Sequence, residues 1–216
     1  NPAAIASSIN LRTNIISALQ LYSKNVEINK FGGRFKYSKI NQLIDRVDNG
    51  ITSNITKIII RRDLKASINQ FAQYELCFGN RFYINPAGYN IKSTGFTVSG
   101  SDKMAYLTDI PNKDSAGNLD GSMKGTISIV SKNNKNQQVV LVKGAGIVDY
   151  MKGEVILNTI NFTSTVAENN IVEVQAYPES NDVVGLKDLF VSFNVSNSTI
   201  NMKEDVIASG EDVSGV

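Results

Sequence analysis

The hydrophobic period of the chain changes once along its length, near residue 65, and this change constrains the fold more than any other feature. Up to that point apolar residues recur at every third or fourth position, which is the pattern of an amphipathic helix. From residue 70 onward apolar and polar residues alternate, which is the pattern of a strand with one buried face. The sequence therefore predicts an α+β protein, with N-terminal helices followed by a mainly antiparallel β region.

The same boundary predicts how the chain is divided. We expect a helical segment with a first strand at residues 1–65, a β-rich domain at 66–200 and a flexible tail at 201–216. Within the first segment, helices are expected at 3–22 and from Ser38, a residue type that caps helices, and the strand at 55–62.

The β region shows the pattern of consecutive hairpins. We expect two of them between residues 126 and 157, separated by a turn at the glycines of Gly144-Ala145-Gly146. The expected strands are 71–78, 95–98, 104–108, 126–130, 139–142, 147–150, 154–157, 171–177 and 189–195.

Charge and residue usage exclude several classes of function. The 22 basic and 20 acidic residues nearly balance and the lysines are scattered, so we expect no surface for nucleic acid or for an anionic membrane. Histidine, the usual acid/base group and the commonest transition-metal ligand, is absent. Cys77 is the single cysteine and lies in an apolar run, which is typical of a buried small side chain. We therefore expect no enzyme, no catalytic residue, no cofactor and no metal site.

A set of arginine, tyrosine and apolar residues in the first segment is the candidate interaction surface. Arginine and tyrosine are enriched at interface cores, and the apolar members form one stripe of the second expected helix. The candidates are Arg34, Tyr37, Ile40, Leu43, Ile44, Val47, Arg61 and Arg62. The alternative is that the charged stems cover the chain's own surface and that the stripe belongs to its core.

Two stretches resemble a known family. Residues 35–57 contain the pattern ID-x-V-D-x-x-I-x-S-N-I-T-K, and residues 146–155 contain G-x-(I/V)-D-Y-x-x-G-x-(I/V). Leu107-Thr108-Asp109 and Gly125-Thr126-Ile127 stand between them in the expected order. These stretches resemble the ring-forming baseplate wedge subunits of T-even-type phages, in the baseplate J-like family, over residues 5–195. Because the chain starts at Asn1 and not at methionine, we expect it to be the C-terminal fragment of such a protein.

The resemblance implies a structural protein of a contractile phage tail, made late in infection. It implies that residues 1–65 dimerise and that the full-length protein forms a ring which joins the baseplate wedges around the central hub. The ring would act as a hinge when the baseplate rearranges. The implied partners are further copies of itself and other wedge subunits, in the virion and, during assembly, in the host cytoplasm. The alternative is a β-rich receptor- or glycan-binding domain of a tail fibre or adhesin, which the Asn-, Ser- and Thr-rich strands also fit.

Overall fold

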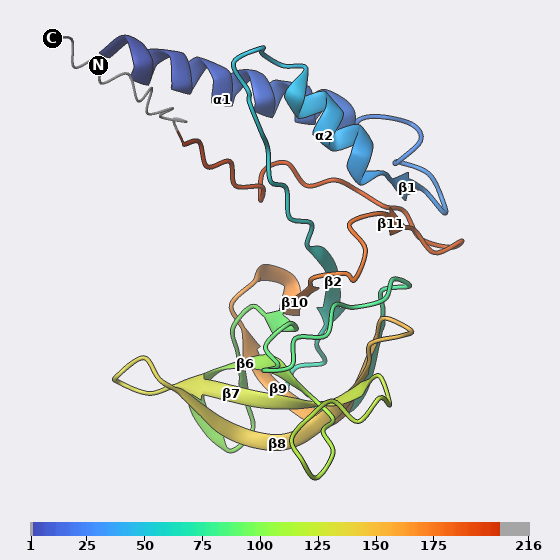
Figure 1. The fold of residues 1–216 in the computed structure, drawn as a ribbon. Coiled ribbons are helices and arrows are strands. Elements are labelled where there is room, and N and C mark those ends of the chain that lie inside the picture. Colours follow the sequence, from blue (N-terminus) through green and yellow to red (C-terminus); the bar gives the residue numbers. More distant parts are fainter. Residues whose placement is uncertain (1, 204–216) are drawn as a thin grey trace, which may run out of the picture.

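From residue 60 onward the described chain consists of strands and loops with one 3-10 turn, five of the strands close into a barrel, and the two described helices lie together beyond one end of it (Figure 1). The computed structural model describes residues 2–203, and side chains from Ser8 onward. The helices and strands are α1 (Pro2–Ser23), β1 (Arg34–Phe35), α2 (Tyr37–Asp45), β2 (Ile60–Lys65), β3 (Phe71–Cys77), β4 (Lys92–Ser93), β5 (Phe96–Val98), β6 (Ser101–Pro111), β7 (Lys124–Lys132), β8 (Gln138–Asp149), β9 (Glu154–Thr165), a 3-10 turn (Glu168–Asn170), β10 (Ile171–Ala176) and β11 (Val183–Val184).

Five antiparallel strands, β5 to β9, form the barrel. Each pairs with the next along the chain, and β9 pairs back with β5, which closes the ring of strands. Closure removes open sheet edges where it is complete. The pairing of β6 with β7 runs without interruption from Ala105 opposite Ser131 to Pro111 opposite Gly125, so this wall of the barrel is regular.

Strand β9 pairs with three other strands. It pairs with β8 at residues 154–157, with β3 at 154–161 and with β5 at 162–165. The hairpin that leads into it turns at Gly153, which has φ +67°. A Cβ atom at this position would collide with the main chain of Asn80, so the turn requires glycine in both conformation and space.

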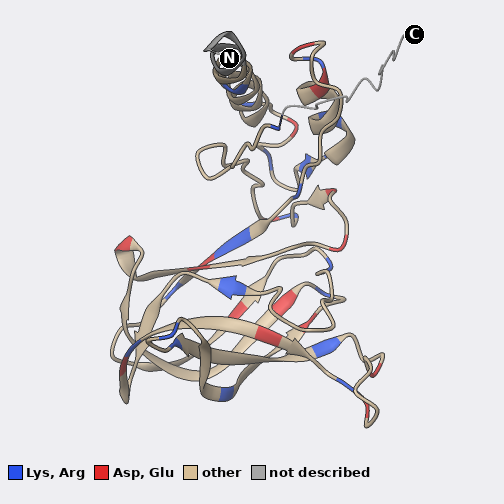
Figure 2. Ribbon diagram, turned by 60° about the vertical axis from the view of Figure 1, so that its left-hand side comes forward, with Lys and Arg blue, Asp and Glu red and all other residues tan. Residues whose placement is uncertain are grey.

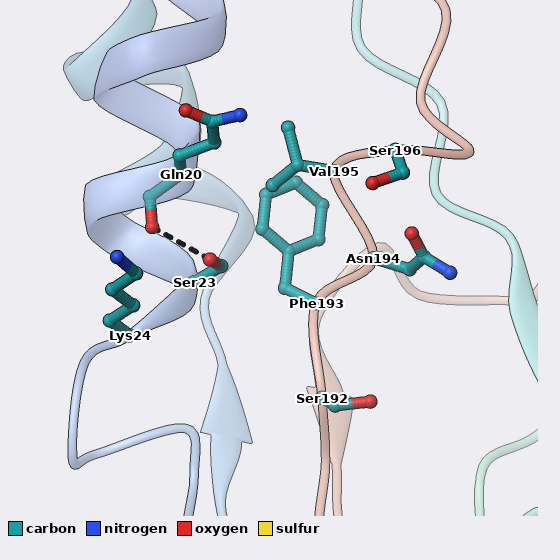
Figure 3. A pocket seen from close by; sticks show the side chains of 8 residues that line it. All are labelled: Gln20, Ser23, Lys24, Ser192, Phe193, Asn194, Val195 and Ser196. Carbon is teal, nitrogen blue, oxygen red and sulfur yellow. Dashed lines mark hydrogen bonds between the residues drawn. The ribbon is translucent and has the colours of Figure 1, made fainter.

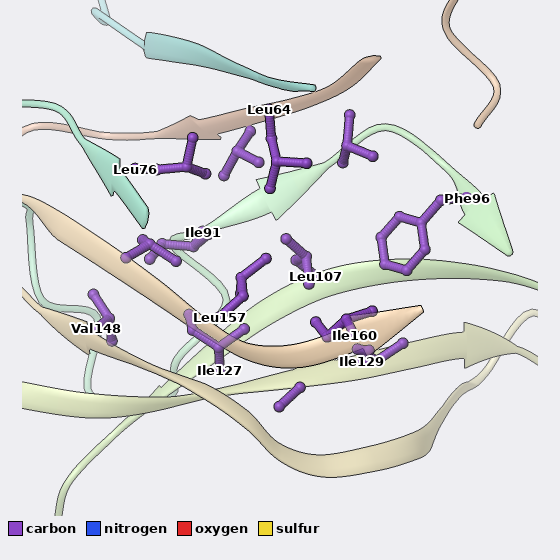
Figure 4. Close-up of a cluster of buried hydrophobic side chains, with 14 of the residues drawn as sticks. Leu64, Leu76, Ile91, Phe96, Leu107, Ile127, Ile129, Val148, Leu157 and Ile160 are labelled. Atoms are coloured by element: carbon purple, nitrogen blue, oxygen red, sulfur yellow. The ribbon is translucent and has the colours of Figure 1, made fainter. Parts of the chain in front are cut away.

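The barrel is filled by one cluster of apolar side chains, several of which Figure 4 shows meeting between the strands. Phe162 stands at its centre and makes edge-to-face contacts with Phe96 and Tyr74, at ring-centroid distances of 4.9 and 5.4 Å. Such contacts add to the stabilisation that comes from burying the rings. The two-residue alternation of β9 places Val155 and Leu157 in this core.

One buried carboxylate lies among these apolar side chains. Asp109, on β6, is fully buried, and its two oxygens accept hydrogen bonds from the Ile91 N–H at 2.6 Å and the Tyr150 hydroxyl at 2.7 Å. The Tyr89 N–H donates to the Asp109 carbonyl at 3.0 Å. A single residue thereby joins β6, the loop before β4 and the β8–β9 turn.

The expectation of an α+β fold is wrong. The two helices described have 22 and 9 residues, whereas β8 and β9 alone have 12 each, and neither helix covers a face of the large sheet. The helical period before residue 65 does produce α1 and α2, but their apolar faces pack with each other and with the C-terminal segment. The fold is mainly β, with a five-stranded barrel.

Several expected elements also differ. Gly144-Ala145-Gly146 is no turn between hairpins, because β8 runs continuously through it with one left-handed residue, Gly144 at φ +72°. The first strand after the helices begins at Ile60, since residues 55–59 have no strand partner among the described residues. Residues 189–195 form no strand and keep one isolated bridge, from Phe190 to Phe31. The expected tail at 201–216 lies outside the described residues except for 201–203.

No helix in the described part of the chain is long and apolar enough to cross a membrane.

The Tyr150–Asp109 hydrogen bond predicts a loss of stability when the hydroxyl is removed. Tyr150→Phe should lower the free energy of unfolding by about 1.5–3 kcal/mol, because a buried carboxylate loses a donor. Urea unfolding monitored by circular dichroism measures the change. Tyr106→Phe, at a half-buried tyrosine on the same strand as Asp109, is the matched control and should stay within about 0.5 kcal/mol of wild type. Equal effects of the two substitutions would contradict the role given to this bond.

The same carboxylate predicts a pH dependence. Burial raises the pKa of Asp109 above its ordinary 3.8, although the hydrogen bonds from Tyr150 and Ile91 act in the opposite direction. A pKa that is higher in the folded state means that the folded state holds the proton more tightly, so this group favours folding more as the pH falls through the raised value. Wild type should therefore gain stability relative to Asp109→Asn when the pH is lowered from neutral, in urea unfolding at a series of pH values. A difference that shrinks on acidification would show that the hydrogen bonds outweigh burial.

Candidate assembly interface

The helices form a second hydrophobic cluster, which we call the helical lobe, together with the C-terminal segment. Its buried members come from α1, the loop after it, β1, α2 and β11, and partly buried residues of 191–200 pack around them. Tyr22, Phe35 and Phe193 form an aromatic triangle, with ring-centroid distances of 6.2, 6.4 and 5.7 Å. Burial raises the pKa of the Tyr22 hydroxyl, which is consistent with a ring held inside this cluster. The lobe therefore needs both ends of the described chain.

A residue from the C-terminal side also fixes the start of α2. The first N–H of the helix, that of Tyr37, donates to the Asp182 carboxylate at 2.8 Å. A carboxylate at a helix N-terminus satisfies a free N–H and interacts favourably with the helix dipole. Ser38, which we expected to cap this helix, lies inside it, and the residue before the helix, Lys36, makes no capping bond with its side chain.

The apolar candidates of the sequence lie on the inner face of α2 and, for Val47, in the turn that follows it. Ile40 is 1% exposed and belongs to the buried part of the helical lobe. Leu43, Ile44 and Val47 are partly buried and pack against the same cluster. The stripe on α2 therefore contributes to the core of its own chain, and its role in an interface stays a prediction.

The polar candidates are separated from one another in the structure. Arg34 is exposed on β1, and the Tyr37 hydroxyl donates to the Thr56 carbonyl at 3.0 Å. Arg61 lies on β2 and pairs with Asp63 at 3.0 Å and with Glu173 on β10 at 2.9 Å. Because β2 and β10 place Asp63 opposite Glu173, Arg61 neutralises two facing carboxylates. Arg62 is half-buried on β2. Arg61 thus has a role in the sheet, and none of these residues joins another in a single site.

Helix α1 is the feature that the list of candidates missed. It is 22 residues long and contains one charged residue, Arg12, and the helix beside the N label in Figure 2 is mostly tan. Of its described side chains only Ile15 and Leu19 are buried, whereas Ile9 is 59% and Leu21 is 76% exposed. A helix in water normally carries charged residues on its open face, so a long exposed helix with one charge is typical of a contact surface. The scarcity of charge was visible in the sequence and could have identified it.

The C-terminal segment runs beside α1 (Figure 1), and two open grooves lie between them. One groove lies at the end of the helix, between Gln20 and Lys24 on one side and residues 192–196 on the other. Figure 3 shows Phe193 and Val195 directed towards the helix. A second groove lies nearer the N-terminal end of α1, between Ile9 and residues 200–202. Both are open and lined by polar and apolar groups, so they suit a protein contact better than a small ligand.

The surface electrostatics of the lobe are weak. Lys39 pairs with Glu27 at 2.8 Å, and this contact raises the pKa of Lys39 and lowers that of Glu27. Both side chains are exposed to solvent, so the pair contributes little to stability.

One group of potential ligands lies on the barrel, where β3 meets β9. The Cys77 thiol lies 3.3 Å from a Glu75 oxygen and 3.6 Å from a Glu154 oxygen. Burial, followed by the two carboxylates, raises the pKa of Cys77 to about 11. The thiol therefore stays protonated at neutral pH, in which form it is a poor nucleophile and a poor metal ligand. These three are the only such group of metal-ligating side chains in the described part of the chain.

The burial of Ile40 predicts that it stabilises the helical lobe. Ile40→Ala should lower the free energy of unfolding by about 2–5 kcal/mol, because it leaves a cavity in a packed cluster. Ile55→Ala is the control at the same residue type, since Ile55 is 89% exposed, and should change stability by less than about 0.5 kcal/mol. Urea unfolding of both variants at one low protein concentration makes the comparison. An Ile40→Ala variant with the same free energy of unfolding as wild type would show that Ile40 does not stabilise the core.

The comparisons with known proteins concern this same part of the chain. No curated protein matches this chain. Residues 4–63, which include α1, α2 and the first sequence pattern of the resemblance, match the family model described as baseplate structural protein gp6, C-terminal domain III. This match supports a structural role in a phage tail baseplate, and with it a place in the virion and assembly with other baseplate components.

Proposed function

We propose that this chain is a self-associating subunit of a contractile tail baseplate, and that copies meet through the helical lobe. The match over residues 4–63 supports the proposal, since it covers α1 and α2 and ends at β2. On this proposal residues 2–59 and 183–203 form the assembly unit, and the barrel is carried by it. The residues proposed for the interface therefore change from the inner stripe of α2 to the exposed face of α1.

The observation that carries the proposal is the exposed, nearly uncharged surface of α1. Ile9 and Leu21 lie on it, and burying them against a partner would release apolar area from water, at about 25 cal/mol per Å². A second copy of the same helix is a suitable partner, because a surface with the single charge of Arg12 requires no complementary charge. Two such faces would meet about a two-fold axis.

A two-fold contact through α1 closes a dimer and does not by itself build a ring. A ring of paired subunits needs a second, different contact on each copy. We propose that this contact lies in a part of the full-length protein outside residues 1–216, as the resemblance implies. The chain would then hold the wedges together around the central hub of the baseplate.

A hinge between the helical lobe and the barrel is the finer part of the proposal. The chain passes between them near Ile60, which packs against both hydrophobic clusters, and again between β10 and β11. Asn80 bridges the two by accepting a hydrogen bond from the Val184 N–H and donating to the Val184 carbonyl, both at 2.9 Å. Two connections and few bonds between the clusters would let one move relative to the other.

The proposal predicts that charge on the outer face of α1 separates the copies. Wild type should show a concentration-stable mass of twice 23.6 kDa in light scattering, and Ile9→Glu with Leu21→Glu should reduce it to one chain. Both positions are exposed, so the variant should remain folded, with an unfolding free energy within about 1 kcal/mol of wild type at low concentration.

The control is Val166→Glu, at an exposed apolar residue after β9 on the barrel, which should keep the dimer mass. A folded dimer that survives both substitutions on α1 would exclude this helix from the interface. A wild-type chain that stays monomeric at all concentrations would contradict self-association through the helical lobe.

A further inference from the structure

The outer half of β8 has a free edge. Residues 138–142 of β8 pair with β7 on one side, but β8 pairs with β9 only at residues 146–149. The pairing ends where the Asn158 side chain donates to the Gly144 carbonyl at 3.0 Å. Within the described residues, no other strand pairs with this edge of β8 between residues 138 and 144. Its outward N–H and C=O groups are therefore open to another strand.

This edge belongs to a strand of 12 residues that contains no proline, and its protection is limited to nearby lysines and to irregular pairing with β7. Here four apolar residues follow one another, from Val139 to Val142, and three of them are exposed, Val140 by 52%. Leu141 alternates to the inside and packs against the barrel core. The β7–β8 hairpin projects beyond the barrel, which leaves the edge accessible (Figure 1).

The charge around the edge indicates what can add to it. Lys132, Lys135 and Lys143 are exposed in and beside the hairpin, and no acidic residue occurs between 130 and 145. Two copies of this edge side by side would place six lysines together without a counter-charge, which opposes self-pairing. An extended segment with acidic side chains would find the opposite charge, unpaired main-chain groups and exposed valines in one place.

We propose that the free edge of β8 binds an acidic, extended segment of a partner protein by strand addition. Main-chain hydrogen bonds to residues 138–143 supply the affinity, the valines cover alternate side chains of the segment, and the three lysines select for acidic residues. This surface lies on the barrel, away from α1, so it is a second interface that does not depend on self-association through the helical lobe.

The test uses the full chain and a fluorescein-labelled synthetic peptide, Glu-Val-Thr-Val-Glu-Val-Thr, read by fluorescence anisotropy. We expect saturable binding that weakens as salt is added. The same peptide with N-methyl groups on alternate residues should bind at least about tenfold more weakly, because it lacks the N–H donors of one edge. Hydrogen exchange should show protection at residues 138–143 when the unmodified peptide is bound.

The charge element is tested by Lys132→Glu with Lys135→Glu and Lys143→Glu. This variant should lose affinity for the acidic peptide by about tenfold or more and prefer the counterpart in which lysine replaces glutamate. The Ile9→Glu, Leu21→Glu variant should bind as wild type does, which separates this proposal from self-association through α1.

The proposal would be overturned by no saturable binding, by equal binding of the N-methylated peptide, or by protection from exchange elsewhere in the chain. It would also be overturned if the peptide dissociated a dimer of the full chain, because that result would assign the edge to a second copy.

Discussion

The pairing of β9 is the constraint on which the rest of the barrel depends. Its twelve residues are shared among β8, β3 and β5, and the barrel closes only because the last four pair with β5. Residues 154–157 of β9 pair with β8 and β3 at once, and β9 pairs with β8 nowhere else, so β8 has no partner on this side before residue 146. Closure of the barrel and the free edge of β8 therefore both depend on how β9 is paired. The Asn158 side chain marks the point of separation, where it replaces a main-chain donor at Gly144.

The helical lobe depends on a different kind of contact, between segments far apart in the sequence. Asp182 holds the start of α2, and Val183, Phe193 and their neighbours complete a cluster that begins at α1. Because these contacts close a loop of about 145 residues around the barrel, the lobe cannot be complete until the barrel has brought residue 177 back to it. The barrel thus brings the C-terminal segment back to the helical lobe. This role is separate from any contact that the barrel's own surface makes.

The sequence predicts local structure here better than it predicts assembly. The period of Ile40, Leu43 and Ile44 correctly places a helix, and the alternation along residues 126–130 correctly places a strand, since both depend on neighbours a few residues away. The closed barrel depends on which strands pair, and nothing local indicates that Thr165 lies opposite Phe96. The apolar stripe of α2 predicts a contact surface and a core face equally, because an apolar face has the same pattern whether it meets its own chain or another. Asp109 likewise has no local pattern, because its partners at positions 91 and 150 come together only in the fold.

The two proposed surfaces differ in chemistry in a way that suits different partners. The exposed surface of α1 is uncharged apart from Arg12 and carries Ile9 and Leu21 among polar residues, so it can bind a copy of itself without a complementary charge. The edge of β8 carries exposed valines, and three lysines but no acidic residue occur between residues 130 and 145, so two copies would bring like charges together there. A structural subunit must join its own kind at one place and other proteins at another, and confusing the two contacts would produce the wrong assembly. Charge at the β8 edge would prevent this confusion, because it disfavours self-pairing at an edge whose open main-chain groups and exposed valines would otherwise permit it.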